Sequence, residues 1–347
     1  MICKKLSFAI TTLAVLASAP LQAAVTFNLI ADPGTPQYAI DGFSAAASLW
    51  SSRLADNITV NIGIGYSSLG AGIIGQTQSW GGYAPYSLVK EVLAANCSSL
   101  DDYSSYAALP SGSSFNRLIN HTSNDPSGYN SSTPYLDTMD NVWMTYANAK
   151  ALGLLDPSPA LDAIICFSPD FNFDFNHNNV APDKIDFVGM AAHEIGHALG
   201  FVSCVDNIDY YQGAFPGSDF LSGLIDLYRF SASSLAQGPG VTDFTSDARD
   251  KYFSVDGGLT SIALFADGLT YGDLRQASHW KDNRGIGLMD PTASYGEALN
   301  ISATDLRAFD VLGYTLTAVP EPGNVLALCA LLMGAMFLRR RRSAIGA

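Results

Sequence analysis

The chain has 347 residues, enough for one large domain or two modest ones with a buried core. Hydrophobic residues make up 48% of it, which excludes the disordered and collagen-like classes of protein. With 18 Lys and Arg against 32 Asp and Glu, the formal net charge is −14, so we expect no nucleic-acid partner, because a polyanion binds to a basic face.

The start of the chain has the pattern of a secretory signal peptide. Two lysines precede an apolar stretch over residues 8–19, which is too short to span a membrane as a mature helix. Small residues around Ala23 indicate cleavage there. We therefore predict a signal peptide over residues 1–23 and an exported protein.

The first half of the remaining chain shows both helical and strand periodicity. Apolar residues at helical spacing predict a helix over 42–54, and the alternation of apolar with small or polar residues predicts a strand over 58–66. A glycine-rich stretch follows over residues 70–82. The same two patterns predict, in chain order, helices over 86–95 and 138–153 and strands over 161–167 and 171–176.

Two further helices are predicted in the second half of the chain. The first covers residues 186–199, from an aspartate N-cap at its first residue to a glycine stop at Gly200. The second begins with a capping pattern over residues 302–305 and ends at Gly313. Between them, we expect loops and short strands over residues 201–278. This order of elements predicts an α+β fold.

The motif His-Glu-Ile-Gly-His occupies residues 193–197, within the predicted helix 186–199. Residues four apart share one face of a helix, so His193 and His197 can bind the same metal ion. Glu194 lies beside them and is the candidate general base for a metal-activated water. The whole chain contains only five His and four Glu, so this motif takes up a large part of both.

A third ligand is needed, because a catalytic zinc site has three protein ligands and one open position. His279 is the only histidine after His197, and Glu297 is the only glutamate between the motif and the tail. Asp206 lies close to the motif in sequence and stays open as an alternative ligand.

The segment around His279 resembles that of a known protease family. His279 is followed by Trp280, and Met289 lies ten residues further on, in Gly-Leu-Met-Asp-Pro, which resembles the Met-turn under the zinc of metzincins. The compact metzincin motif has its third histidine where Ser203 stands. The 82-residue separation from His197 to His279 resembles instead the leishmanolysin-like branch, and a group of PEP-CTERM-tailed zinc metalloproteases. The resemblance covers roughly residues 183–295.

The resemblance implies a metzincin-like zincin with a small mixed sheet, an active-site helix and a loop-rich C-terminal half. It implies that His193, His197 and His279 bind Zn²⁺, that Glu194 is the catalytic base, and that Met289 is the turn methionine. The expected activity is hydrolysis of peptide bonds in a protein or peptide substrate. Two alternatives stay open: a weakly active or inactive binding protein of the surface or matrix on a metalloprotease scaffold, and a zinc hydrolase of non-peptide substrates.

A calcium site is a weaker candidate. Asp170, Asn172, Asp174, Asn176 and Asn178 alternate as in a calcium-binding loop, but the glycine and the bidentate glutamate of the EF-hand are missing from their places. We expect an edge strand here, and Ca²⁺ stays open as a second cofactor.

Three cysteines remain between the two ends of the chain: Cys97, Cys166 and Cys204. They allow at most one internal disulfide, and their spacing does not choose the pair. Cys166 and Cys204 flank the predicted helix 186–199 and are one candidate pair.

The end of the chain, residues 319–347, has the pattern of a sorting tail. A Pro-Glu-Pro cluster precedes an apolar run over 325–338, shorter than the ~20 residues of a comfortable span, and four arginines follow at once. This order resembles the PEP-CTERM tail of Gram-negative bacteria. It implies a short transmembrane helix, transient anchoring in the inner membrane, removal by an exosortase-type sorting enzyme, and release to the cell surface or extracellular matrix. We expect one catalytic domain over residues 24–318, with subdomains that meet near residue 200.

Overall fold

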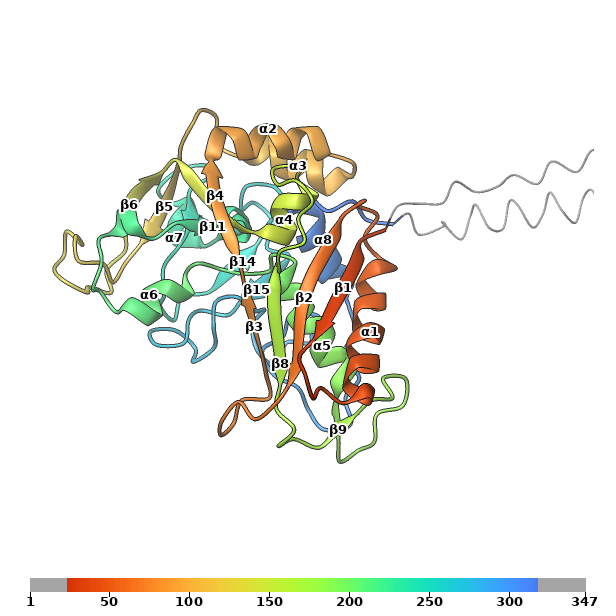
Figure 1. Ribbon diagram of the computed structural model, residues 1–347. Helices are drawn as coiled ribbons and strands as arrows, with labels where there is room; N and C mark the ends of the chain where they lie inside the picture. The colour runs from red at the N-terminus through yellow and green to blue at the C-terminus, as the bar shows by residue number, and fades with distance from the viewer. Residues whose placement is uncertain (1–23, 318–347) are drawn as a thin grey trace, which may run out of the picture.

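The computed structural model describes residues 24–317 (Figure 1). The predicted signal peptide and the predicted sorting tail, residues 319–347, lie outside this range. Within it, no helix combines the length and the apolar composition needed to cross a bilayer.

A four-stranded sheet forms one side of the molecule (Figure 1). Its strands, in sheet order, are β1 (Thr26–Ala31), β2 (Thr59–Tyr66), β8 (Ala163–Phe167) and β3 (Gly75–Ser79). The first three are parallel, and β3 joins β8 as an antiparallel edge strand. The central strand β2 is buried over residues 60–65, and its apolar side chains belong to the core. The predicted strands 58–66 and 161–167 are confirmed.

Two helices pack together on this sheet: α1 (Gln37–Ser51) and α5 (Phe187–Ala198). Phe43 of α1 contacts Phe187 of α5 edge to face, with ring centroids 5.3 Å apart. Gly42 permits this approach, because a Cβ there would lie 2.5 Å from the Phe187 ring. Both helices are predicted by the sequence, although α1 begins five residues earlier than expected.

The other elements form smaller sheets, in the orders β11-β7-β4, β13-β5-β6, β12-β14-β15 and β10-β9. The strands are β4 (Gly81–Pro85), β5 (Phe115–Ile119), β6 (Tyr135–Met139), β7 (Asn141–Thr145), β9 (Phe173–Asp174), β10 (Ile185–Asp186), β11 (Ser222–Gly223), β12 (Arg229–Phe230), β13 (Thr242–Asp243), β14 (Lys251–Phe253) and β15 (Ala263–Phe265). The helices are α2 (Tyr86–Asn96), α3 (Leu100–Ala108), α4 (Tyr146–Ala151), α6 (Asp206–Tyr211), α7 (Ala232–Leu235), α8 (Ala303–Val311) and the 3₁₀ turns η1 (Gly217–Asp219) and η2 (Leu224–Tyr228). Helices with small mixed sheets confirm the predicted class.

Some predicted elements are wrong. The helix expected over 138–153 is strand β7 in its first half and helix α4 only over its last residues. Strand β7 pairs with β4, and this long-range pairing overrides the local helical pattern. The strand expected over 171–176 is reduced to two paired residues. Helix α3 and the β5–β6 hairpin were not predicted.

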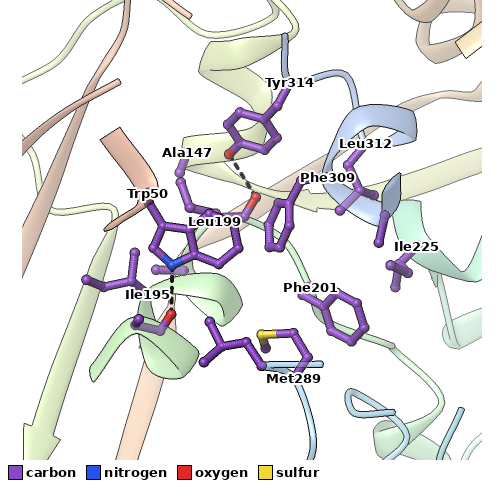
Figure 2. Packing of buried hydrophobic residues seen from close by; sticks show 14 of the residues in the cluster. Trp50, Ala147, Ile195, Leu199, Phe201, Ile225, Met289, Phe309, Leu312 and Tyr314 are labelled. Atoms are coloured by element: carbon purple, nitrogen blue, oxygen red, sulfur yellow. Dashed lines mark hydrogen bonds between the residues drawn. The ribbon is translucent and has the colours of Figure 1, made fainter. Parts of the chain in front are cut away.

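The core behind α5 joins the two ends of the described chain (Figure 2). Trp50 of α1 donates its indole N–H to the carbonyl of Ala192, at 2.8 Å. Tyr314, which follows α8, donates its hydroxyl to the carbonyl of Leu199 at the end of α5, also at 2.8 Å. Phe309 of α8 packs against the ring of Trp50. Helix α5 is therefore held along its length by segments from both ends.

We predict that Tyr314→Phe lowers the free energy of unfolding by about 1–2 kcal/mol, because the buried carbonyl of Leu199 loses its donor. Urea unfolding curves measure the change. Tyr295→Phe is the matched control, because Tyr295 is 62% exposed, and a shift within about 0.5 kcal/mol is expected for it. Equal stability of the two variants would show that the bond to Leu199 does not hold α5.

Candidate metal centre

Helix α5 places His193 and His197 one turn apart, with their Nε2 atoms 3.1 Å from each other. The chain then turns at Gly200, whose φ of +118° is readily adopted only by glycine. This turn brings the carbonyl of Phe201 back to His197. The sequence places both histidines correctly on one helical face.

The third histidine arrives from the other half of the chain. The Nε2 atom of His279 lies 3.2 Å from that of His193 and 3.3 Å from that of His197. Ligand atoms of all three residues lie within 4.8 Å of one another. The structure thus brings together the three histidines that the sequence analysis selected.

Each of the three imidazoles donates its Nδ1–H to a backbone carbonyl. The acceptors are Leu288 for His193 at 2.8 Å, Phe201 for His197 at 2.7 Å and Gln276 for His279 at 3.2 Å. Because Nδ1 carries the proton, every Nε2 atom presents a lone pair, and the three lone pairs face the same point. A cation at that point is the natural partner for them.

The spacing of the nitrogens fits a tetrahedral metal. Bonds of ~2.0–2.1 Å at tetrahedral angles set ligand nitrogens about 3.3 Å apart, and the observed separations are 3.1, 3.2 and 3.3 Å. Burial and the neighbouring imidazoles lower the pKa of His197 to about 3 and that of His279 well below its usual value. Both rings are therefore neutral near pH 7, as metal ligands must be.

Glu194 lies beside the histidines with its carboxylate held in one place. Thr77 of the edge strand β3 donates its hydroxyl to Oε2 of Glu194 at 2.6 Å. Burial raises the pKa of Glu194, while His193 and the bond from Thr77 oppose the rise. Thr77 was missed by the sequence analysis, because nothing local marks a threonine on a glycine-rich strand as a partner of residue 194.

The histidines and Glu194 line a cleft of about 1150 Å³. Strand β3 forms one side of it and runs along α5, since the Thr77 hydroxyl also lies 3.1 Å from the carbonyl of Glu194 and Ser79 lies 3.4 Å from that of His197. Residues 274–276 and Ser278 belong to the lining as well. The candidate metal centre is therefore open to a sizeable ligand.

Met289 lies beneath α5, fully buried (Figure 2). A Cβ on Gly196 would lie 2.6 Å from the sulfur of Met289, so the glycine of the motif leaves room for the methionine. The backbone N–H of Trp280 donates to the carbonyl of Met289 at 2.9 Å, which ties the turn to the segment that carries His279. Met289 therefore packs against the helix that carries the motif, while its role as a turn methionine stays a prediction.

Asp305, on the first turn of α8, holds this region through a fully buried carboxylate. It accepts four N–H donors: the backbone of Leu288 at 2.7 Å, Met289 at 3.3 Å and Ser302 at 2.7 Å, and the indole of Trp280 at 2.8 Å. The peptide group between Leu288 and Met289 therefore has two partners. Its carbonyl accepts from Nδ1 of His193, and its N–H donates to Asp305. A carboxylate polarises this peptide and increases the electron density at the histidine. Sequence reasoning identified only the capping pattern of Asp305.

Asp206 acts on the third histidine through the backbone and is no ligand in this structure. Its carboxylate accepts from the N–H of Ala277 at 2.6 Å and from the hydroxyl of Ser278 at 2.6 Å. The Ser278 hydroxyl in turn accepts from the N–H of Ser203 at 2.9 Å. The group of possible metal ligands among the described residues therefore leaves Asp206 out. Its carboxylate anchors the segment that carries His279, and Ser203 takes part where the compact motif has a histidine.

Glu297, the other candidate considered, is exposed, and its carboxylate accepts from the backbone of Ser294. The N-cap position of α5 is occupied by Asp186, as predicted, but the side chain does not cap the helix. Instead it accepts from His177 Nδ1 at 2.6 Å and from the N–H of Leu299 at 3.1 Å. His177 thus belongs to the packing at the start of α5.

The remaining sequence candidates make other contacts. Within residues 24–317 all three cysteines are free, so the proposed bridge between Cys166 and Cys204 is not formed. Asp170 accepts from Ser68 and Ser168, and the Asp174 carboxylate accepts backbone N–H groups of its own loop. The calcium site stays a prediction.

Comparison with known proteins returns no relative: no family model, no curated protein and no solved structure matches the chain. The likeness to metzincins therefore stays a prediction from the sequence motifs. What the chain can do chemically follows from the geometry of the site itself.

We predict that Asp305→Asn weakens zinc binding roughly 10- to 100-fold, the range for partners that orient metal-binding histidines. In the variant, the side-chain amide replaces one carboxylate oxygen that accepts from the N–H of Leu288 or Met289. An NH₂ group then faces these backbone N–H donors and disturbs the peptide that holds His193. Competition with a chelator of known zinc affinity measures the loss.

Asp102 supplies a matched control, because it has the same capping-box position on α3. Its carboxylate accepts from Ser98 and Ser99 only, within its own turn. Asp102→Asn should lower stability and leave the affinity for zinc unchanged. Equal zinc affinities of the two variants would show that Asp305 does not support the metal centre.

Proposed function

We propose that this protein is a zinc-dependent endopeptidase of metzincin-like architecture. The observation that carries the proposal is the convergence of three Nε2 lone pairs, 3.1–3.3 Å apart, beside a buried carboxylate in a large cleft. Three imidazole nitrogens in tetrahedral spacing suit Zn²⁺, whereas Ca²⁺ and Mg²⁺ take oxygen ligands. His193, His197 and His279 would hold the ion, and the fourth position would stay open for water or substrate.

The chemistry that zinc supplies in such a site is polarisation of the scissile carbonyl and a lowered pKa of water. Glu194 accepts the proton of the attacking water and later passes it to the leaving amine. Burial raises the pKa of Glu194, which favours its uptake of the proton. Thr77 holds Oε2 in place and leaves Oε1 for the water.

The size of the cleft supports a polypeptide substrate. Pockets for small molecules occupy about 300–1,000 Å³, and this cleft has about 1150 Å³. One side of it is the edge strand β3, beside which an extended chain can lie.

We further propose that the protein is exported through residues 1–23 and sorted through residues 319–347. The tail would anchor it transiently in the inner membrane until an exosortase-type enzyme removes it at the cell surface or in the matrix. The sequence patterns of the two ends support this route.

We predict that Glu194→Gln lowers cleavage of an unfolded protein such as reduced casein by about 10²–10⁴-fold, because the variant loses its general base. The three histidines are intact in this variant, so its zinc content should equal that of the wild type. Glu297→Gln is the control for loss of a carboxylate, because Glu297 is exposed. Equal cleavage by wild type and Glu194→Gln would contradict the proposed catalysis by Glu194. No cleavage by either would contradict the peptidase proposal and favour a binding protein on an inactive scaffold.

A further inference from the structure

The cleft is bordered by the edge strand β3, and its lining includes residues on both sides of the histidines. Thr77 lies level with Glu194 and Ser79 with His197, and the strand then passes through Trp80 into β4. Gly72 and Met190 line the end of the cleft near the start of α5. The opposite end lies beyond His197, where Val202, Leu221 and Trp143 line it.

The position of the Trp143 indole is set by a glycine. Trp143 is on β7, and its neighbours Val142 and Met144 turn to the core on the opposite face. A Cβ on Gly81 would lie 2.4 Å from Cζ2 of Trp143, so the indole lies directly on the backbone of Gly81. The residue is half-buried: it packs against the hydrophobic cluster that includes Val205 and Phe220, and it also contributes to the lining of the cleft. An aromatic surface beside an enzyme cleft can take a flat or bulky apolar group.

The surroundings of Trp143 are apolar and carry little free charge. Val202 and Leu221 are half-buried beside it in the lining. Arg275 is paired with Asp282 at 2.8 Å, and the Asp206 carboxylate is engaged by residues 277–278. Asp219 is exposed at the rim. Aliphatic walls with an aromatic floor favour an apolar side chain over a charged one.

The distance from the candidate base fixes which substrate residue would reach this place. Gly81 follows Thr77 by four residues, so the two lie at most roughly 13 Å apart at about 3.3 Å per residue, because the chain leaves β3 at Ser79 and enters another sheet at Gly81. A substrate that lies extended along the same edge has the same rise per residue. Its third or fourth residue from the scissile bond would therefore lie over Trp143.

We propose that Trp143, with Val202 and Leu221, forms a specificity subsite for an aromatic or large aliphatic side chain, three or four residues from the scissile bond. This inference rests on the proposed endopeptidase function. It makes the preferred substrate an extended polypeptide with an apolar anchor on one side of the cut. The subsite is distinct from the metal centre, because none of its three residues contacts the histidines through hydrogen bonds.

Cleavage mapping tests the subsite. Zinc-loaded wild-type protein is incubated with a proteome-derived peptide library, and the cut sites are identified by mass spectrometry. We expect aromatic and large aliphatic residues to be enriched at the third or fourth position on one side of the cut. Trp143→Leu should reduce the aromatic enrichment about three- to tenfold, in line with the worth of one aromatic contact. No enrichment there, or enrichment of Lys and Arg toward Asp219, would overturn the proposal.

Two further variants separate specificity from folding. Val202→Thr replaces one methyl group by a hydroxyl of similar size, so it should weaken the enrichment in a folded protein. Tyr103→Leu removes an aromatic ring that is 60% exposed on α3 and should leave the profile unchanged. An unchanged profile in both Trp143→Leu and Val202→Thr would contradict the subsite.

A binding experiment keeps the subsite testable if no cleavage occurs. Fluorescently labelled decapeptides, with or without one Phe, are titrated against the Glu194→Gln protein and against the double variant with Trp143→Leu. Tighter binding of the Phe peptide, lost in the double variant, would support the subsite even if the peptidase proposal failed. Cleavage without any preference for Phe would reject the subsite alone.

Discussion

The structure depends on one electrostatic constraint: the lone pairs of three imidazole nitrogens face one another at close range. Each Nδ1–H is engaged by a backbone carbonyl, so the rings cannot relieve the repulsion by a change of tautomer. Their burial also opposes protonation, and the pKa values of His197 and His279 are lowered accordingly. Such an arrangement costs free energy unless a cation occupies the centre, which is the physical reason for assigning a metal site here.

The fold supports this centre from three directions. Helix α5 supplies two candidate ligands and the candidate base, and it is held by α1 on one side and by Tyr314 on another. Asp305 connects α8 to the turn beneath the metal centre and, through one peptide, to His193. Asp206 connects the segment after α5 to the backbone that carries His279. Two aspartate carboxylates that accept backbone N–H groups thus position the candidate ligands from a distance.

The sequence predicted what depends on local periodicity and on rare residue types. The helical spacing of residues 193 and 197 is a local property, and the scarcity of histidine left His279 as the one histidine able to complete the set. Strand 58–66 was visible because its alternation is regular. The predictions of fold and of ligands therefore rest on strong local signals.

What the sequence did not reveal depends on long-range contacts. Strand β7 was read as helix because its pairing with β4 involves residues about sixty positions away. Thr77, Asp305 and Asp206 were missed as supporting residues, because each acts on a site far from it in the chain. Trp143 lies within the helix predicted over 138–153, and an aromatic residue in a helical pattern indicates core packing. The sequence therefore did not indicate that Trp143 lines a cleft.

The most direct measurement of the central claim is anomalous X-ray scattering at the zinc edge from crystals of the metal-loaded protein. The account predicts one strong peak, bonded at about 2.0–2.1 Å to the Nε2 atoms of His193, His197 and His279. A zinc position without His279, or one bonded to the Asp206 carboxylate, would contradict it.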